Sequence, residues 1–311
     1  MTATYASAYA SARGAALDAA AGQNYPPAAL YVVATPIGNL ADITLRALHV
    51  LSLADTIACE DTRHTQTMLR AYGIDKGSAQ LLAVHQHNEA QAAQTVIERL
   101  QQGQRVAYAS DAGTPAISDP GARLVAAVRR AALPVIPLPG ASSVTTALSV
   151  AGIAGEGVQQ GQFVFIGFLS SKSTERASAV SALALEARAV VLLEAPHRIE
   201  ALATALALLG ERALTVGREL TKQFEEIATI GAHTFPDWLA AQPHRCRGEF
   251  VLVLHPATVT AETGSEQRVL KLLLAELPLK TAVKLCAELT GASRNALYQS
   301  ALALKNEDAD G

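Results

Sequence analysis

Short apolar runs alternate with segments of helical spacing along the first half of the chain. The apolar runs predict strands at residues 30–36, 56–61, 81–87, 105–110 and 134–140. Apolar positions three and four apart predict helices at residues 44–54, 62–73, 89–103, 119–132 and 141–152. Because parallel strands need crossover connections, this alternation predicts a mostly parallel sheet that helices cover on both faces.

The second half begins after a glycine-rich stretch and has a different strand pattern. Residues 152–161 show no apolar period, so we place a domain boundary there. Predicted strands follow at residues 163–169, 189–196, 213–220, 224–231 and 248–256, with helices at 174–187 and 198–210. The third and fourth of these strands have little between them, which indicates an antiparallel hairpin. The second domain is therefore expected to contain a mixed sheet.

The two ends of the chain differ from this α/β pattern. Residues 1–28 are rich in Ala and Ser, without the basic start and apolar centre of a signal peptide, and we expect a disordered leader. Residues 257–265 form a polar linker, and residues 266–304 have the spacing of a helix-turn-helix around Gly291. The expected architecture is two α/β domains, at 29–152 and 161–256, followed by a helical tail.

Composition and charge narrow the function classes. Half of the 311 residues are apolar and 17% are charged, which is typical of a globular chain. The formal net charge of −3 argues against indiscriminate binding of nucleic acid through phosphates. The three cysteines lie far apart without a C-x-x-C pair, which favours a reducing cytoplasm over a disulfide framework or a zinc site. No apolar run reaches membrane-spanning length.

Four predicted strand ends carry polar and turn-forming residues: "ATPIGN" (34–39), "CEDTR" (59–63), "SDAGTP" (110–115) and "LPGASS" (138–143). Ligands of open α/β sheets bind beyond the carboxyl ends of the strands. The Asp111 carboxylate is suited to accept hydrogen bonds from a ribose or an ammonium group, and Gly113 lets the backbone approach a ligand. Ser142 and Ser143 open a helix, where they either meet a polar ligand or only cap the helix. The G-x-G-x-x-G and G-x-x-x-x-G-K-[ST] signatures are missing, which argues against a standard dinucleotide fold and a P-loop NTPase.

Further polar clusters occur in both predicted domains, and the two of the second domain, "EAPHR" and "GRELTKQFEE", suggest a wet cleft that faces the first domain. The clusters are "CEDTR" with Glu60, Asp61 and Arg63, "HQHNE" with His87 and Asn88, "EAPHR" with Glu194, His197 and Arg198, and "GRELTKQFEE" with Arg218 and Lys222. Paired carboxylates beside a guanidinium can orient a hydroxyl or abstract a proton, although internal ion pairs would explain the same residues. The histidines do not group as metal ligands, so we expect no metal.

Together these stretches resemble the ribosomal RNA small subunit methyltransferase I family, within the tetrapyrrole-methylase-like (class III) S-adenosylmethionine methyltransferases. The likeness covers residues 29–256 and extends into the tail. It implies S-adenosylmethionine bound between two α/β domains, a homodimer, and methylation of a cytidine ribose 2′-hydroxyl in the decoding region of 16S rRNA, on the assembled small subunit. Motif matching implies that these residues lie at the methyl donor: Pro36, Asp111, Ala112, Gly113, Ser142 and Ser143, with Glu194 and Ala195 from the second domain.

The same likeness assigns expected roles toward the RNA. A ribose hydroxyl is a weak nucleophile that gains from a positioned base, for which Asp61, Glu194 and His197 are candidates that the sequence does not rank. A mechanism of orientation alone stays open. The residues expected to contact substrate are Glu60, Arg63, His87, Asn88, Arg198, Arg218, Lys222 and, on the tail, Arg294.

Two alternatives are kept beside the RNA methyltransferase. A methylase of tetrapyrrole precursors would carry a G-x-G-P-G-D loop after its first strand, where this chain has "ATPIGN". A non-enzymatic helix-turn-helix binder of nucleic acid would use the tail, but it leaves the strand-end loops without a purpose. The tail itself either contacts RNA or packs against the rest of the protein.

Overall fold

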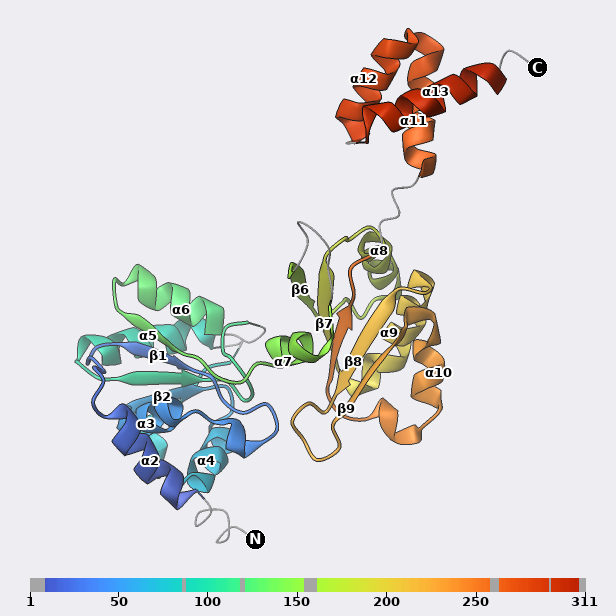
Figure 1. Cartoon of the computed structure of the whole chain (residues 1–311). Helices are drawn as coiled ribbons and strands as arrows, with labels where there is room; N and C mark the ends of the chain where they lie inside the picture. The colour runs from blue at the N-terminus through green and yellow to red at the C-terminus, as the bar shows by residue number, and fades with distance from the viewer. Residues whose placement is uncertain are drawn as a thin grey trace. The chain divides into compact units, whose positions relative to one another are not determined.

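The computed structural model describes residues 9–85, 88–117, 121–153, 161–257, 263–290 and 292–307. The chain divides into two compact units, and the boundary between them in the sequence lies between Pro256 and Ala257. Within the described residues the first unit contains two five-stranded sheets, and the second contains three helices (Figure 1). This is the expected α/β fold with a helical tail.

The first sheet is parallel throughout, in the strand order β3-β2-β4-β1-β5. Its strands are β1 (Leu30–Val33), β2 (Thr56–Cys59), β3 (Leu81–Ala83), β4 (Val106–Ala109) and β5 (Val135–Leu138). Strands β2 and β4 are buried along their whole length, because helices cover both faces of the sheet. The order changes direction around β1 and β4, so the loops that follow these two strands lie side by side.

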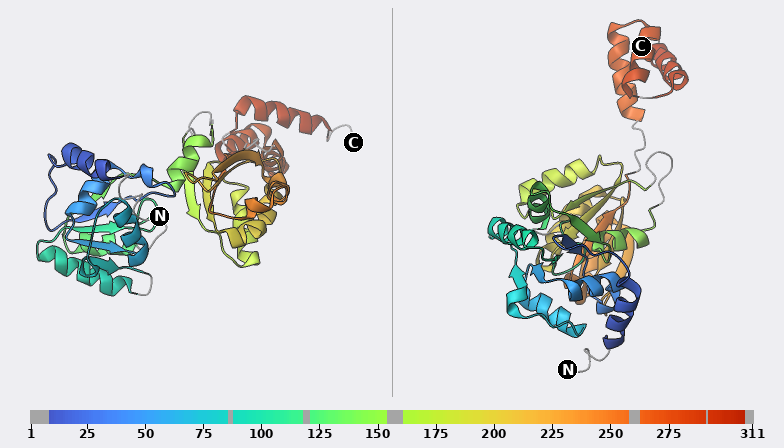
Figure 2. Two further views of the ribbon diagram at one scale, coloured as in Figure 1. Left: turned by 90° about the horizontal axis from the view of Figure 1, so that it is seen from below. Right: turned by 90° about the vertical axis from the view of Figure 1, so that its left-hand side faces the viewer.

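Helices pack on each face of this sheet (Figure 1), and the layering is visible from a second direction (Figure 2). On one face lie α3 (Leu45–Leu53) and α4 (Thr62–Ala71), which bury Leu48, Leu51, Leu69 and Tyr72. On the other lie α5 (Glu89–Gln101) and α6 (Gly121–Arg130), which bury Val96, Leu100, Leu124 and Val128. These four helices confirm the helices that the apolar spacing of the sequence predicts.

The second sheet is mixed, in the order β6-β7-β10-β8-β9. Its strands are β6 (Phe163–Gly167), β7 (Ala189–Glu194), β8 (Ala213–Arg218), β9 (Glu226–Gly231) and β10 (Phe250–Leu254). Only β6 and β7 pair in parallel, and β8 and β9 form the predicted hairpin. One face is covered by α8 (Ser173–Leu183), α9 (Ile199–Leu206) and α10 (Phe235–Ala240). Short 3₁₀ turns lie at Leu40–Asp42, Ser78–Gln80, Pro196–Arg198, Ala207–Leu209, Ala232–Thr234 and Pro243–Cys246.

A small apolar cluster joins the two halves of the first unit. Helix α7 (Ser143–Val150), which leaves the first sheet, buries Val144 and Ala147 against the uncovered face of the second sheet. Ile37 from the loop after β1 and Leu220 from the loop after β8 belong to the same cluster. The cluster therefore fixes loops of both sheets against one another.

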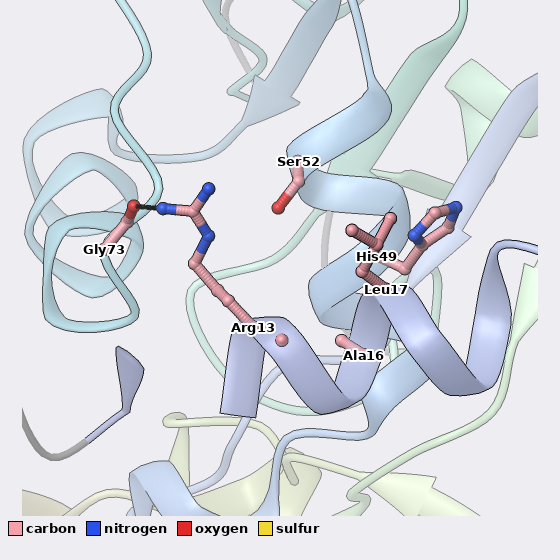
Figure 3. Close-up of a pocket in the computed structure, with 7 residues that line it drawn as sticks. Arg13, Ala16, Leu17, His49, Ser52 and Gly73 are labelled. Atoms are coloured by element: carbon pink, nitrogen blue, oxygen red, sulfur yellow. Dashed lines mark hydrogen bonds between the residues drawn. The ribbon is translucent and has the colours of Figure 1, made fainter. Parts of the chain in front are cut away.

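The expectation of a disordered leader is wrong for residues 9–28, whereas residues 1–8 lie outside the described chain. Residues Ala10–Ala20 form helix α2, which packs along α3 and buries Ala16 and Ala20. Alanine has the highest helix propensity, and two alanines four apart place a small, flat face on α3. Figure 3 shows this contact, with Arg13 donating a hydrogen bond to the carbonyl oxygen of Gly73.

The second unit is a three-helix pack. Its helices are α11 (Thr263–Glu276), α12 (Leu279–Thr290) and α13 (Arg294–Glu307), around a core that includes Leu270, Val283, Cys286 and Leu297. Helices α12 and α13 are the two predicted helices of the helix-turn-helix, and the turn residue Gly291 lies outside the described residues. No helix in the described part of the chain has the length and apolarity needed to cross a membrane.

The packing of α2 predicts different outcomes for one substitution at two neighbouring positions. Ala16→Glu places a carboxylate in the seam with α3 and should release the helix, because burying an unpaired charge costs several kcal/mol. Ala15 is exposed, so Ala15→Glu should leave the helix in place. Hydrogen exchange followed by mass spectrometry measures amide protection across residues 10–20. Equal protection in the two variants would show that the helix does not depend on this contact.

Candidate functional site

A hollow of about 320 Å³ lies where loops of both sheets meet. Its walls come from the loop after β1 (Pro36, Ile37, Gly38), helix α4 (His64, Thr67, Met68), the loop after β4 (Asp111, Ala112), and Lys222 and Glu249 of the second sheet's loops. The hollow therefore lies beyond the carboxyl ends of β1 and β4, where the strand order changes direction. Four residues predicted for the site line it together: Pro36, Asp111, Ala112 and Lys222.

Backbone hydrogen bonds bind the strand-end loops to one another. Thr35 and Gly113 exchange two backbone hydrogen bonds, each 3.0 Å long. Gly113 has a φ of +80°, and a Cβ atom there would lie 3.2 Å from Cγ2 of Ile37. The Thr114 hydroxyl donates to the carbonyl oxygen of Ala141 at 3.0 Å, which ties in the loop after β5. Conformation and the nearby Ile37 side chain both favour glycine at residue 113, while its expected approach to a ligand stays a prediction.

Asp111 is held in place by two neighbouring acidic residues. Its backbone N–H donates to Oε1 of Glu60 at 3.2 Å, and its Oδ1 accepts from the backbone N–H of Asp61 at 3.3 Å. Its second oxygen, Oδ2, accepts no hydrogen bond from the described residues. Glu60 thus holds the backbone of Asp111, and the Asp111 carboxylate keeps acceptor capacity for a ligand in the hollow.

Asp61 is the N-cap of helix α4, and the hydrogen bonds of this cap lower the pKa of its carboxyl group. Its Oδ1 accepts from the backbone N–H groups of Arg63 at 2.8 Å and His64 at 3.4 Å. These hydrogen bonds stabilise the carboxylate and hold the pKa of Asp61 below its ordinary value. A depressed pKa makes a carboxylate a weaker base, and Asp61 does not line the hollow. The exposed Arg63 pairs with it at 3.5 Å.

Lys222 is fixed between two carboxylates. Its ammonium group lies 2.8 Å from Oε1 of Glu219 and 3.1 Å from Oε2 of Glu249. Burial opposes its charge, but hydrogen bonds to these two groups outweigh burial and raise the pKa of Lys222 above its ordinary value. Lys222 therefore stays charged at neutral pH and forms a rigid part of the wall.

Glu194, a candidate base and donor contact, is almost fully buried at the end of β7. Its Oε1 accepts from the backbone N–H of Ala195 at 2.8 Å and lies 3.1 Å from Nε of Arg198, while its Oε2 has no partner among the described residues. Glu194 pairs in register with Phe250, the residue after Glu249. It therefore lies at the end of the second sheet whose loops line the hollow. It does not line the hollow itself, and His197 is exposed in the turn that follows.

Ser142 and Ser143 lie at the start of α7 and do not line the hollow. The Ser142 side chain makes no capping hydrogen bond, so the simple capping role weighed from the sequence is not what the structure shows. Within the described residues, no group of three or more His, Cys, Asp or Glu side chains is arranged to hold a metal ion.

Several other predicted substrate contacts are bound within the protein. Arg218 is buried, and its guanidinium donates to the carbonyl oxygens of Phe224, His244 and Arg247 at 2.9–3.0 Å, so the expectation of a substrate contact is corrected. The Asn88 amide bonds the backbone of His85 and Ala83 and closes the strand end locally. Arg198 pairs with Glu194, Arg294 of the second unit pairs with Glu288 at 3.4 Å, and His87 lies outside the described residues.

Sequence reasoning missed the contribution of helix α4 and of Glu249. His64, Thr67, Met68 and Ala71 lie three and four residues apart, so they share the face of α4 that lines the hollow. This spacing follows directly after "CEDTR" and was a readable signal. Glu249 had no such signal, because it reaches the hollow through its pairing with Lys222.

Two family models match successive parts of the chain. Residues 29–232 match the family model described as Tetrapyrrole (Corrin/Porphyrin) Methylases, and residues 260–305 match the RsmI C-terminal HTH domain. The ribosomal RNA small subunit methyltransferase I of Neisseria meningitidis serogroup A is 48% identical over 282 residues, which cover 89% of this chain and 94% of that protein. The protein of that name from Escherichia coli O157:H7 is 46% identical, over 88% and 94% of the two chains. The chain belongs to the ribosomal RNA small subunit methyltransferase I family.

Solved structures show how the family's fold is shared. The cobalt precorrin-4 methyltransferase matches with a TM-score of 0.52 at 16% identity, over 73% of this chain and 94% of the other. A uroporphyrin-III C-methyltransferase of Thermus thermophilus, complexed with S-adenosyl homocysteine, matches with a TM-score of 0.51 at 17% identity, over 73% and 96%. At these identities the likeness establishes the fold alone, and the predicted fold and family are confirmed.

Gly38 gives a test of the contact that closes the hollow. A Cβ atom there would overlap Cγ of Lys222 and lie 3.1 Å from the carbonyl oxygen of Leu220. Gly38→Ala should therefore force the two loops apart and cost about 1–3 kcal/mol of stability, visible as a lower melting temperature. Gly77→Ala is the matched control, because its nearest neighbour would be 3.9 Å away. Equal melting temperatures for the two variants would contradict this close approach.

Proposed function

We propose that this protein transfers a methyl group from S-adenosylmethionine to the ribose 2′-hydroxyl of a cytidine in the decoding region of 16S rRNA, on the assembled small subunit. The observation that carries the proposal is the likeness, over nearly the full chain, to ribosomal RNA small subunit methyltransferases I. The hollow supports it, because it joins the predicted donor loop around Asp111 to Lys222 of the second sheet.

The residues of the hollow suit such a donor. When bound, S-adenosylmethionine supplies a methyl group on a sulfonium, which carries its own leaving group. The free acceptor oxygen of Asp111 fits a ribose hydroxyl or an ammonium group, and Ile37 and Met68 offer apolar surface to a purine ring. The nearby carboxylates of Glu60 and Glu249 favour a cationic ligand.

The protein's main contribution would be orientation. None of the three candidate bases, Asp61, Glu194 and His197, lines the hollow, and the depressed pKa of Asp61 weakens it as a base. Holding a hydroxyl oxygen in line with a reactive methyl group supplies a large part of the barrier reduction by itself. We therefore favour an orientation mechanism, with Glu194 and Arg198 stabilising the edge of the second sheet.

Contacts with the RNA would come from exposed cations around the hollow. The side chain of Arg63 is 91% exposed beside His64, and its pairing with Asp61 is long, so it is available to a phosphate. The three-helix unit would add contacts through Arg294. We further propose a cytoplasmic homodimer, as the family resemblance implies, with RNA presented by a folded particle because the chain's net charge is −3.

The predicted donor contact is tested by Asp111→Asn. Removing the charge should raise the dissociation constant for S-adenosylmethionine by about 10-fold or more, because hydrogen bonds to a charged group contribute about 1.5–3 kcal/mol. Isothermal titration calorimetry measures this directly. Asp18→Asn, on the exposed face of α2, is the control and should bind as the wild type does. Unchanged affinity in Asp111→Asn would remove Asp111 from the donor site.

The reaction is tested on RNA from cells that lack the protein. Nuclease digestion and mass spectrometry should find the decoding-region cytidine without its ribose methyl group. The full chain should restore the methyl group, and a chain ending at residue 257 should restore it poorly if the three-helix unit contacts RNA. A 16S rRNA whose methylation is the same with and without the protein would refute the proposed substrate.

A further inference from the structure

A second hollow of about 720 Å³ lies at the same end of the second sheet, beside the loop that joins β8 to β9. Its lining includes Gln223, Phe224, His244 and Arg247. Phe224 has 69% of its surface exposed, although a phenylalanine is normally buried. The Phe224 ring is not part of the buried core, and it does not line the hollow around Asp111 and Lys222, which is called the donor hollow from here on.

The loop that carries Phe224 is held firmly in one conformation. The buried Arg218 donates to the Phe224 carbonyl oxygen at 3.0 Å, and the backbone N–H of Thr221 donates to Oε2 of Glu225 at 2.5 Å. Glu219 and Thr221 have φ values of 52° and 67°, a left-handed backbone conformation that is costly for residues other than glycine. The exposure of the ring is therefore fixed by the surrounding contacts.

The charges around the ring leave one cation available. Glu219 pairs with Lys222, and Glu226 lies 2.7 Å from Arg245 and 3.7 Å from Arg218. Arg247 is exposed, and its guanidinium pairs with no carboxylate among the described residues. The second hollow thus presents an aromatic face and an available guanidinium to solvent, beside the exposed carboxylate of Glu225, which accepts a hydrogen bond from the Thr221 backbone.

The same two segments of the chain line both hollows. Lys222 and Glu249 line the donor hollow, and two residues away on each segment Phe224 and Arg247 line the second. An extended polymer with one unit in the donor hollow would place a neighbouring unit over Phe224. Resting on the proposed function, we propose that Phe224 and Arg247 form a subsite for an unpaired nucleotide of the RNA, with the base stacked on the ring and its phosphate bound by the guanidinium.

The chemistry of this surface favours RNA over a protein partner. The residues that share the second hollow with Phe224 are mainly polar or charged, whereas the core of a protein interface is apolar and depleted of charge. Stacking on an aromatic ring combined with a cation at the phosphate is the way in which proteins bind single-stranded nucleic acid. The subsite would hold a base outside its helix while its neighbour is methylated.

Substitutions at residue 224 separate stacking from simple apolar contact. On small subunits purified from cells lacking the protein, Phe224→Ala should raise KM between about 5-fold and 100-fold, as loss of one stacked base predicts. Phe224→Leu keeps the apolar bulk and should lose nearly as much, whereas Phe224→Trp should stay within about 3-fold of the wild type. Affinity for S-adenosylmethionine should not change. Leu208→Ala, which removes a side chain that is 78% exposed on the same domain, is the matched control and should keep the wild-type KM.

Fluorescence gives a second readout that does not depend on methylation. The chain has one tryptophan, Trp238, so Phe224→Trp adds a reporter whose emission should be quenched by a single-stranded RNA oligonucleotide, beyond any change in the wild type. Arg247→Ala should reduce the slope of log affinity against log salt by about 0.7, the value for one lost phosphate contact.

Four outcomes would overturn the subsite. An unchanged KM in Phe224→Ala, while the wild type methylates 16S rRNA, refutes the subsite and leaves the proposed function standing. A KM that rises in Phe224→Ala but is restored by Phe224→Leu shows apolar packing without stacking. Loss of self-association in Phe224→Ala, with RNA binding intact, assigns the ring to a second copy of the chain. An absence of quenching in Phe224→Trp refutes the subsite whether or not the wild type methylates 16S rRNA. Inactivity of the wild type on 16S rRNA, by contrast, refutes the proposed function.

Discussion

The apolar contact between the two sheets is the constraint on which the site depends. Ile37 and Leu220 are buried together with Val144 of α7 and Val251 of β10. Removing a side chain of this size from water contributes about 1.5–3 kcal/mol, which is far more than a surface ion pair supplies. Ile37 stands between Pro36 and Gly38, and Leu220 stands two residues before Lys222, so burying these two side chains also positions the walls of the donor hollow.

The seam works only because small residues let the backbones approach. Between the two sheets, a Cβ atom at Gly38 would overlap the Lys222 side chain, and among the first sheet's own loops one at Gly140 would lie 2.8 Å from Cβ of Ala34. Each loop is therefore held by its neighbour instead of by its own helical or strand hydrogen bonds. This explains why the chain uses long, turn-rich connections after β1 and β4, where two or three residues would join a strand to a helix.

The elements of the fold could be predicted from local pattern, and the errors have identifiable causes. Strands such as Val106–Ala109 are apolar throughout, and their burial on both faces follows from that pattern. Helix α2 was missed because its buried face consists of alanines, which carry no strong apolar period. The loop around Asp111 was found because it follows a strand, a feature that sequence order alone reveals.

The role of a charged side chain was harder to predict, because it depends on pairing across the fold. Arg218 looked like a substrate contact, yet three carbonyl oxygens from separate segments surround its guanidinium. Glu249 belongs to no motif in the sequence, yet it lines the hollow and pairs with Lys222. A sequence shows that such groups are present but not which of them neutralise one another.

The distribution of charge then explains how an acidic protein can serve a polyanion. Inside the donor hollow and directly behind it, Asp111, Glu60, Glu219 and Glu249 outnumber the single cation Lys222, so this region favours a cationic ligand and repels phosphate. Exposed guanidinium groups occur outside it, at Arg63 in the first turn of α4 and at Arg247 shortly before β10. In the proposed function, an RNA strand would therefore be bound by its phosphates only at the margin, while a ribose alone would reach inward. Charge would then separate the two proposed ligands by position, and the net charge of the chain says little about either.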